Sequence, residues 1–335
     1  MIGGLVRRLR TLAEPPVPPR ISSCFRPIDQ QGLAALEEAL HRHYFAARSA
    51  AYFDSSEGRV DMSAHLTGRL EACRRIIVPW LDSVGPLAGT RILEIGCGTG
   101  SDLVALAEQG ADVTGLDLNS AALAAAEERL RLYGVTARLA ERNAAELSKD
   151  FAGERFDWVI FYASLEHMTI PERLASLRAG WDLLTEGGRL CVIETPNRLW
   201  FRDGHTAWLP FFHWLPDELA FQFARHSPRK SLRDECASQE SDAMMGFLRS
   251  GRGVSFHEFS LAIAPAESLE VASALHSYRR GTAGRTLRSI LPTRDDRYAA
   301  FLKSLAPEIH PAFYREQLDL ILRKAVGASG AAPAN

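Results

Sequence analysis

The strongest chemical signal in the chain is a run of three glycines after an apolar segment. Residues 91–100 read Arg-Ile-Leu-Glu-Ile-Gly-Cys-Gly-Thr-Gly, which places glycine at positions 96, 98 and 100. Glycine adopts positive φ readily and leaves bare backbone against which a ligand can lie. A helix predicted for residues 101–109 would point its N-terminal N–H groups at that ligand. An ordinary strand–loop–helix turn or a dinucleotide-binding turn would also explain this segment alone.

The spacing of the glycines departs from the dinucleotide fingerprint G-x-G-x-x-G/A. Ser101 stands at its sixth position, the third glycine comes one place early, and Glu94 lies inside the strand. This arrangement resembles motif I of the class I S-adenosylmethionine (SAM) methyltransferases. The resemblance implies SAM as the cofactor, with S-adenosylhomocysteine as its product. Its site would include Glu94, Gly96, Cys97, Gly98 and Gly100.

Further features follow in the order that this family requires. A predicted second strand, residues 111–118, ends in Asp117, which lies 21 residues after Gly96. A carboxylate roughly 20 residues beyond the glycine turn is placed to accept the ribose hydroxyls. The resemblance adds Leu118 beside it, and Asn143 and Ala144 at the end of a third strand, as contacts of the adenosine.

The remaining core elements predict a parallel α/β sheet. A helix over residues 120–133 has Ser120 as its predicted N-cap, a fourth strand at 156–162 ends in Tyr162, and a Gly187-Gly188 turn precedes a fifth strand. The resemblance spans about residues 70–200. It implies a seven-stranded, mostly parallel, doubly wound sheet, the Rossmann-like methyltransferase fold with helical lid insertions, and places Tyr162 at the cofactor.

Two more strands are expected beyond the fifth. Val254–Ile263 partly alternates and is the predicted sixth strand, and Phe313–Arg323 is the predicted seventh, antiparallel as in the family. The predicted organisation is a flexible leader (1–30), a SAM-binding core with N-terminal helices (31–196), an aromatic lid (197–250), C-terminal strands (251–326) with a helical insertion at about 266–310, and a disordered tail (327–335).

Two helices predicted before the core, at 31–50 and 62–81, would cover one side of the cofactor site. His65 and Arg69 lie four residues apart and therefore share a helix face. Arg69 would pair there with the carboxylate of the methionine part of SAM. A solvated helix face is the alternative.

A histidine after the fourth strand is the leading candidate for catalysis. Methyl transfer from SAM is an in-line displacement, so the enzyme mainly has to align the nucleophile with the methyl group. A hydroxyl nucleophile must also lose its proton to a general base. His167 follows the fourth strand, and the segment Leu165-Glu-His-Met168 resembles one in small-molecule methyltransferases, including quinone-ring O-methyltransferases. Alternatively, His167 only fixes the loop or packs against SAM.

The predicted lid is unusually aromatic. Residues 197–223 hold eight aromatic side chains together with Asp203, His205 and His213. Such a lid could exclude water and wall the acceptor site, or the aromatics could form the core of the insertion. The predicted substrate residues are Trp200, Asp203, Trp208, Phe212 and Trp214, and His205 and His213 are further candidate bases. A metal site from Glu166, Asp203 and His205 is conceivable, but its spacing matches no dedicated motif, so no metal is predicted.

Composition limits the partners. A net charge of −2 provides no global basic field for nucleic acid, and no Asn/Asp-Pro-Pro-aromatic motif follows the fourth strand. Five scattered cysteines without a C-x-x-C pair favour a cytoplasmic enzyme, and no apolar run approaches the roughly 20 residues of a membrane span. The basic N-terminus could touch a membrane surface. Arginines of the insertions are either solvated or bind an anionic acceptor: Arg225, Arg229, Arg233, Arg279, Arg280, Arg285, Arg288, Arg294 and Arg297, with Lys230.

The leading hypothesis is a SAM-dependent methyltransferase of bacterial biosynthesis that acts on a hydroxyl of a small-molecule, sugar or lipid-linked acceptor. Two alternatives remain, which are N- or C-methylation of a metabolite and a non-catalytic partner subunit with this fold. The lid aromatics could equally form a homodimer interface.

Overall fold

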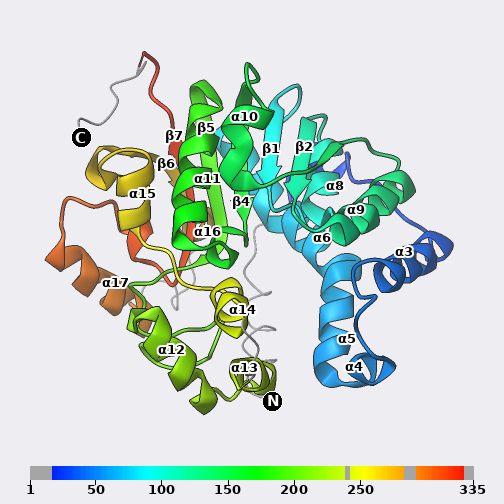
Figure 1. The fold of residues 1–335 in the computed structure, drawn as a ribbon. Helices are drawn as coiled ribbons and strands as arrows, with labels where there is room; N and C mark the ends of the chain where they lie inside the picture. The colour runs from blue at the N-terminus through cyan, green and yellow to red at the C-terminus, as the bar shows by residue number, and fades with distance from the viewer. Residues whose placement is uncertain (1–16, 238–241, 283–291, 328–335) are drawn as a thin grey trace. The chain divides into compact units, whose positions relative to one another are not determined.

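The computed structural model describes residues 17–237, 242–282 and 292–327. Its strands form one seven-stranded sheet in the order β3-β2-β1-β4-β5-β7-β6 (Figure 1). The strands are β1 (Arg91–Ile95), β2 (Asp112–Asp117), β3 (Arg138–Glu141), β4 (Phe156–Tyr162), β5 (Leu184–Pro196), β6 (Glu270–Ala274) and β7 (Gln317–Arg323). β1, β2 and β3 pair in parallel, whereas β7 is antiparallel to β5 and β6. This confirms the predicted fold class and the antiparallel seventh strand.

The chain divides into two compact units. The first consists of residues 1–143, 154–159 and 277–285, and the second of 144–153, 160–276 and 286–335. β4 contributes residues to both.

In the first unit, β1 is buried from Ile92 onward and pairs with β2 in the register Arg91↔Asp112. Helices α8 (Ser101–Ala107) and α9 (Ser120–Tyr133) pack on these strands. α9 begins where predicted, but Ser120 is not its cap. The side chain of Asn119 accepts hydrogen bonds from the N–H groups of Ala121 and Ala122 at 3.0 and 3.2 Å. An amide oxygen one residue earlier therefore takes the capping position.

The N-terminal segment of the first unit is helical but interrupted. Its elements are α2 (Pro19–Ser22), α3 (Gln30–Arg42), α4 (Ala50–Asp54), α5 (Ser56–Ser63), the π-helical turn η2 (Ala64–Gly68), α6 (Arg69–Ala72), the π-helical turn η3 (Cys73–Ile77) and α7 (Val78–Val84). The predicted helix 31–50 thus ends early, and the one at 62–81 lies within a longer run. The buried Arg129 joins this run to the glycine loop, because it donates to the carbonyls of Thr99, Leu66 and His65.

The second unit contains the antiparallel half of the sheet. β5 and β7 pair in the register Leu190↔Leu322, and β6 pairs with the other edge of β7. β5 already begins at Leu184, so the predicted Gly187-Gly188 turn lies within the strand, with Gly187 at φ 73°. The helices are η4 (Ala144–Glu146), α10 (Leu147–Asp150), η5 (Leu165–His167), α11 (Ile170–Asp182), η6 (Phe212–Trp214), α12 (Asp217–Phe223), η7 (Ala224–His226), α13 (Lys230–Cys236), α14 (Ala243–Arg249), α15 (Phe256–Ala262), η8 (Ala266–Ser268), α17 (Arg294–Leu305) and η10 (Pro311–Tyr314), and α16 (Leu275–Thr282) is shared with the first unit.

The predicted sixth strand, Val254–Ile263, is wrong. The structure places helix α15 there, and the sixth strand is β6 at Glu270–Ala274. Ser255 and Glu258 form a capping box in which the Ser255 hydroxyl lies 2.6 Å from the Glu258 carboxylate. Phe259 and Ala262 lie three residues apart and are both buried. The apolar residues that partly alternate in this segment therefore belong to the inner face of a helix.

Residues of the predicted lid build a small core of their own. Its buried members are Ala207, Phe212, Ala220, Ala224, Leu232 and Phe247. Helices α12, α13 and α14 contact one another and gather in one group (Figure 1). Some of the predicted features lie outside the described residues. They are residues 238–241 of this segment, part of the predicted leader, Arg285, Arg288, and all but the first residue of the predicted tail. Within the described ranges, no helix is both long and apolar enough to span a membrane.

The cap of α9 can be tested directly. Asn119→Ala removes the acceptor of two N–H groups, so we expect a loss of about 1 kcal/mol in the free energy of unfolding. Ser120→Ala, at the residue that the sequence predicts as the cap, should change it by less than about 0.5 kcal/mol. Urea unfolding of the two variants measures both values. Equal losses would contradict the assignment of the cap.

Candidate active site

The glycine loop of the first unit is held open by its backbone conformation. Gly96, Gly98 and Gly100 all have positive φ, at 81°, 50° and 75°. A Cβ on Gly100 would lie 2.8 Å from the Cβ of Ala126, so helix packing alone requires glycine there. A Cβ on Gly98 would meet nothing within 4 Å. Gly98 thus presents bare backbone to open space, where a ligand can lie.

Asp117 is tied to this loop. It ends β2, and its Oδ2 accepts a hydrogen bond from the N–H of Gly98 at 2.8 Å. Its Oδ1 accepts one from the N–H of Asn119, also at 2.8 Å. Each carboxylate oxygen keeps a second lone pair. Asp117 is therefore fixed beside the loop and can still accept two hydroxyl groups of a ligand.

Glu94 adds a buried carboxyl group behind the loop. Its side chain is buried in β1, and its Oε2 has no hydrogen-bond partner among the described residues. Burial, followed by the nearby carboxylates of Asp102 and Asp117, raises the pKa of Glu94 well above its usual range. A buried polar atom without a partner is costly. A bare glycine, a fixed carboxylate and an unsatisfied carboxyl group together fit a ligand that carries a ribose and positive charge, as SAM does.

The other predicted cofactor residues are distributed over both units. In the first, Leu118 is exposed, Cys97 is buried, Asn143 is half-buried and Arg69 is exposed on α6. In the second lie Ala144, which is buried, and Tyr162, which donates to the Glu194 carboxylate at 3.3 Å. Their contacts with SAM remain predictions.

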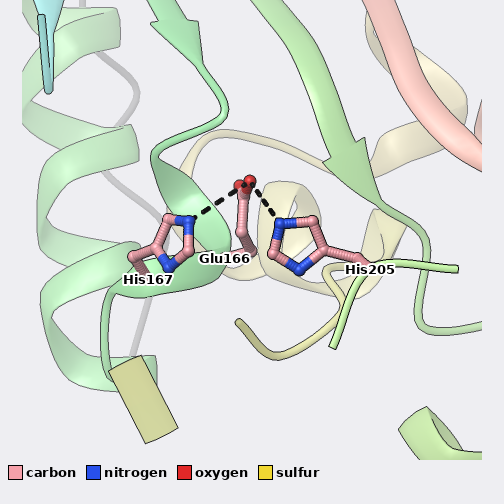
Figure 2. Close-up of side chains that lie close together, drawn as sticks. All are labelled: Glu166, His167 and His205. Carbon is pink, nitrogen blue, oxygen red and sulfur yellow. Dashed lines mark ion pairs between the residues drawn. The ribbon is translucent and has the colours of Figure 1, made fainter. Parts of the chain in front are cut away.

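The second unit brings three chemically active side chains together (Figure 2). Glu166 and His167 lie on η5, directly after β4, and His205 comes from the segment that follows β5. The Oε1 of Glu166 lies 3.8 Å from His167 Nε2 and 3.9 Å from His205 Nε2. Glu166 is fully buried, whereas the side chains of His167 and His205 are 43% and 32% exposed. We call these three residues the histidine cluster, which opens to solvent on the side of its two imidazoles.

Both imidazoles are held from behind. His167 Nδ1 lies 2.7 Å from the carbonyl oxygen of Arg249, which can only accept, so Nδ1 carries the proton. His205 Nδ1 lies 3.2 Å from the hydroxyl of Thr206, whose own proton is donated to the carbonyl of Gly251. His205 Nδ1 is therefore a donor as well. In both rings Nε2 is thereby the nitrogen without a proton, and it faces Glu166.

Burial favours the neutral forms of two members of the cluster, Glu166 and His205. Burial raises the pKa of Glu166 to about 8, although the hydrogen bond from Thr195 opposes this. Burial lowers the pKa of His205 to about 4, and the neighbouring His167 contributes to the shift. A neutral imidazole with a free Nε2 can accept a proton or bind a metal ion.

Comparison with known proteins identifies the part of the chain that holds the glycine loop, Asp117, Glu166 and His167. Residues 92–188 match a family model described as a methyltransferase domain. These residues form a class I SAM-dependent methyltransferase domain. The ubiquinone biosynthesis O-methyltransferase of Pseudomonas aeruginosa is 36% identical over 121 residues, which are 36% of this chain and 50% of that protein. Its counterpart from Pseudomonas entomophila is 35% identical over the same coverage.

The chain therefore spans about half the length of the curated relatives it matches. Among solved structures, magnesium protoporphyrin IX methyltransferase from Synechocystis with bound SAM is 22% identical, with a TM-score of 0.37. That alignment covers 51% of this chain and 79% of the other. Asp203, His205, His213 and the lid lie beyond the matched part of the methyltransferase domain.

Asp203 and His213 are structural neighbours of the histidine cluster. Asp203 is buried, and its carboxylate accepts the N–H groups of His205, Thr206 and Ala207. His213 Nε2 lies 3.2 Å from the same carboxylate. Burial alone would raise the pKa of Asp203, but His213 and the backbone N–H groups hold it well below its usual range. The two residues thus build the turn that carries His205, and their predicted roles as base and substrate ligand remain untested.

The predicted lid aromatics divide into two groups. Trp200 and Phe212 are buried, Trp200 against Tyr298 and Phe212 in the small helical core. Trp208 and Trp214 are 56% and 51% exposed. Trp208 and the exposed Phe211 both have φ of 57°, which is strained for an aromatic residue. The exposed aromatics are therefore the ones available to an acceptor.

Sequence reasoning overlooked Arg173 of α11. Its buried guanidinium donates to the carbonyls of Leu165 and Met168 on either side of the histidine cluster's η5 turn. It also donates to the carbonyls of Arg252 and Gly253 and pairs with Glu258 at 3.1 Å. The only sequence signal was an arginine on the inner face of an amphipathic helix. Arg229 was predicted to be either solvated or bound to an anionic acceptor, and in the structure it donates to the carbonyls of His205 and Thr206.

The loop glycines provide a matched test of ligand binding. A methyl group on Gly98 would occupy the open space over the loop, so we expect Gly98→Ala to weaken S-adenosylhomocysteine binding by about tenfold or more. Gly89→Ala is the control, since Gly89 also has positive φ (75°) and open space around its Cβ but lies before β1. Gly100→Ala should mainly lower stability, because its Cβ would clash with Ala126. Calorimetry and thermal unfolding separate these effects. Equal affinities of the Gly98 and Gly89 variants would contradict the assignment.

Arg173→Met tests what holds the histidine cluster in place. It removes the ion pair with Glu258 and one donor from each of four carbonyl groups in the interior, so we expect a loss of about 3–5 kcal/mol in the free energy of unfolding. Arg178→Met, on the exposed face of the same helix, should cost less than about 0.5 kcal/mol. Guanidinium unfolding measures both. A similar midpoint for the two variants would show that Arg173 is dispensable.

Proposed function

We propose that this protein transfers the methyl group of SAM to a hydroxyl group of a small-molecule, sugar or lipid-linked acceptor. The observation that carries the proposal is the histidine cluster, in which the half-exposed imidazoles of His167 and His205 each have an Nε2 without a proton. The bound cofactor supplies an electrophilic methyl group on a sulfonium. The protein has to hold that cofactor, remove the proton of the acceptor and align the two.

The donor side of the proposal rests on the methyltransferase domain. Asp117 would accept the ribose hydroxyls, and the backbone of Gly96 and Gly98 would face the methionine part. Glu94, with its unsatisfied oxygen, would compensate positive charge on the cofactor. Asn143 and Leu118 would contact the adenine, and Arg69 would pair with the carboxylate.

The acceptor side rests on the second unit. In the simplest arrangement His167 is the general base, because its Nδ1 proton is bound to the Arg249 carbonyl and its side chain is half-exposed. The carbonyl would stabilise the imidazolium that forms when Nε2 takes the hydroxyl proton. His205 is the second candidate base.

The exposed aromatics suggest an acceptor with an apolar part. Trp208, Phe211 and Trp214 offer stacking surfaces at the solvent boundary. The Pseudomonas relatives are named for ubiquinone biosynthesis, which supports an aromatic hydroxyl as one acceptor class. The cysteines of the described residues are free thiols, which supports a cytoplasmic location.

Replacement of His167 tests the base. His167→Ala should leave the affinity for S-adenosylhomocysteine unchanged and lower turnover by about 10²- to 10⁴-fold. His226→Ala, an exposed histidine of η7 outside the cluster, is the matched control. An unchanged rate in His167→Ala would remove it as base and favour a nitrogen or carbon acceptor.

The acceptor can be sought with methyl-labelled SAM and fractionated bacterial extract. Label in an alkali-stable ether would identify O-methylation, and an alkali-labile ester would exclude a hydroxyl acceptor. If the wild-type protein fails to bind S-adenosylhomocysteine, the non-catalytic alternative replaces the proposal.

A further inference from the structure

The histidine cluster has the composition of a metal site. One atom each of Glu166, His167 and His205 can be chosen so that all three lie within 4.8 Å of one another. In Figure 2 both imidazoles point their nitrogen atoms at the same end of the Glu166 side chain. No metal site was predicted from the sequence. The set of residues considered for one included Asp203, which the structure uses to build the neighbouring turn.

The hydrogen bonds behind the imidazoles are those that metal-binding histidines require. A ligating histidine usually donates its second ring N–H to a carbonyl, a carboxylate or another acceptor, which fixes the tautomer and the ring plane. His167 does so to Arg249 and His205 to Thr206. Both Nε2 lone pairs are thereby directed at Glu166 Oε1, at 3.8 and 3.9 Å.

This convergence places three potential ligand atoms around one point. Two imidazole nitrogens face a carboxyl oxygen at 3.8 and 3.9 Å, which is too long for a hydrogen bond. Glu166 Oε1 is fully buried and has no hydrogen-bond partner among the described residues. A cation at the centre would satisfy this oxygen.

We propose that Glu166 Oε1, His167 Nε2 and His205 Nε2 bind a divalent transition-metal ion of the zinc class. Two imidazoles with one carboxylate favour Zn²⁺ or Co²⁺ over Mg²⁺, which prefers oxygen ligands. Three protein ligands with an open position are typical of catalytic rather than structural zinc. Ligand atoms on tetrahedral zinc are about 3.3 Å apart for bonds of roughly 2.0 Å, so the rings would move inward by about half an ångström.

The surrounding backbone fits this arrangement. Gly251 has φ of 115°, and a Cβ there would lie 2.6 Å from the His205 ring. The absence of a side chain at this glycine therefore lets the imidazole occupy its position. The N–H of Arg252 holds the carbonyl of Glu166 at 2.9 Å, which fixes the other ligand.

The ion deepens the proposed function and rests on it for its role. The acceptor hydroxyl would take the open position, where the ion acidifies it and its proton leaves to solvent water. That oxygen then forms the new C–O bond with the methyl carbon, while the C–S bond of the donor breaks and its electron pair stays on sulfur. His167 then serves as a ligand instead of as the base.

The test uses the full-length, tag-free protein and Zn²⁺ or Co²⁺ alone. After exchange against chelator and titration, we expect one ion per chain by mass spectrometry of the metal, and an intense tetrahedral absorption with Co²⁺. Glu166→Gln and His205→Ala should lower the affinity by more than the roughly 10- to 100-fold typical of losing an outer hydrogen-bond partner. Thr206→Val, which removes the acceptor behind His205 and its hydrogen bond to the Gly251 carbonyl but no ligand, should fall within that range. His226→Ala should bind like the wild type.

The outcomes separate this inference from the proposed function. Wild-type protein that retains no stoichiometric ion, or variants that all bind equally, would overturn the metal site. Circular dichroism checks that each variant is folded, and the wild-type and Thr206→Val measurements decide the matter if a ligand variant is not. Binding of S-adenosylhomocysteine to the metal-free protein should be unchanged, because the donor residues are different ones. If the wild-type protein binds the ion but not S-adenosylhomocysteine, the methyltransferase proposal is refuted and the metal site stands.

Discussion

The site in the second unit depends on one buried guanidinium. Arg173 has no water to solvate it, so the fold must surround it with acceptors, and it takes them from two segments that are far apart in sequence. One segment carries Glu166 and His167, and the other runs beside His205. A charge that has to be neutralised in the interior thereby fixes the separation of two backbone segments. The geometry of the histidine cluster follows from this constraint.

Much of the parallel half of the sheet was predictable from sequence, because short-range rules govern it. The glycine loop, Asp117 and the apolar run of β4 each report on their own segment, and β4 was placed at the residues that the structure shows. The antiparallel half was harder. In Val254–Ile263 a two-residue alternation and a helical repeat overlap, and the capping box of Ser255 and Glu258 decided for helix.

The candidate site was predictable in its members but not in its grouping. His167 and His205 were both candidate bases, yet nothing in their spacing indicates that they converge on Glu166. That convergence depends on Asp203 folding the chain into a turn, on Gly251 allowing close approach and on Arg173, none of which a linear motif encodes. The aromatic lid was ambiguous for a similar reason, since the sequence cannot say which rings turn inward, as Phe212 does, and which outward, as Trp208 does.

The strained display of Trp208 and Phe211 has a consequence for how such a protein can diversify. The carboxylate of Asp203 holds this loop in place by accepting hydrogen bonds from backbone N–H groups and pairing with His213. None of these bonds involves the side chains of Trp208 and Phe211, which form the aromatic tip of the loop. The tip can therefore be exchanged while the turn beneath it keeps its form. If these rings contact the acceptor as proposed, acceptor choice and catalytic geometry can evolve separately, because substitutions of a few exposed rings leave the turn unchanged.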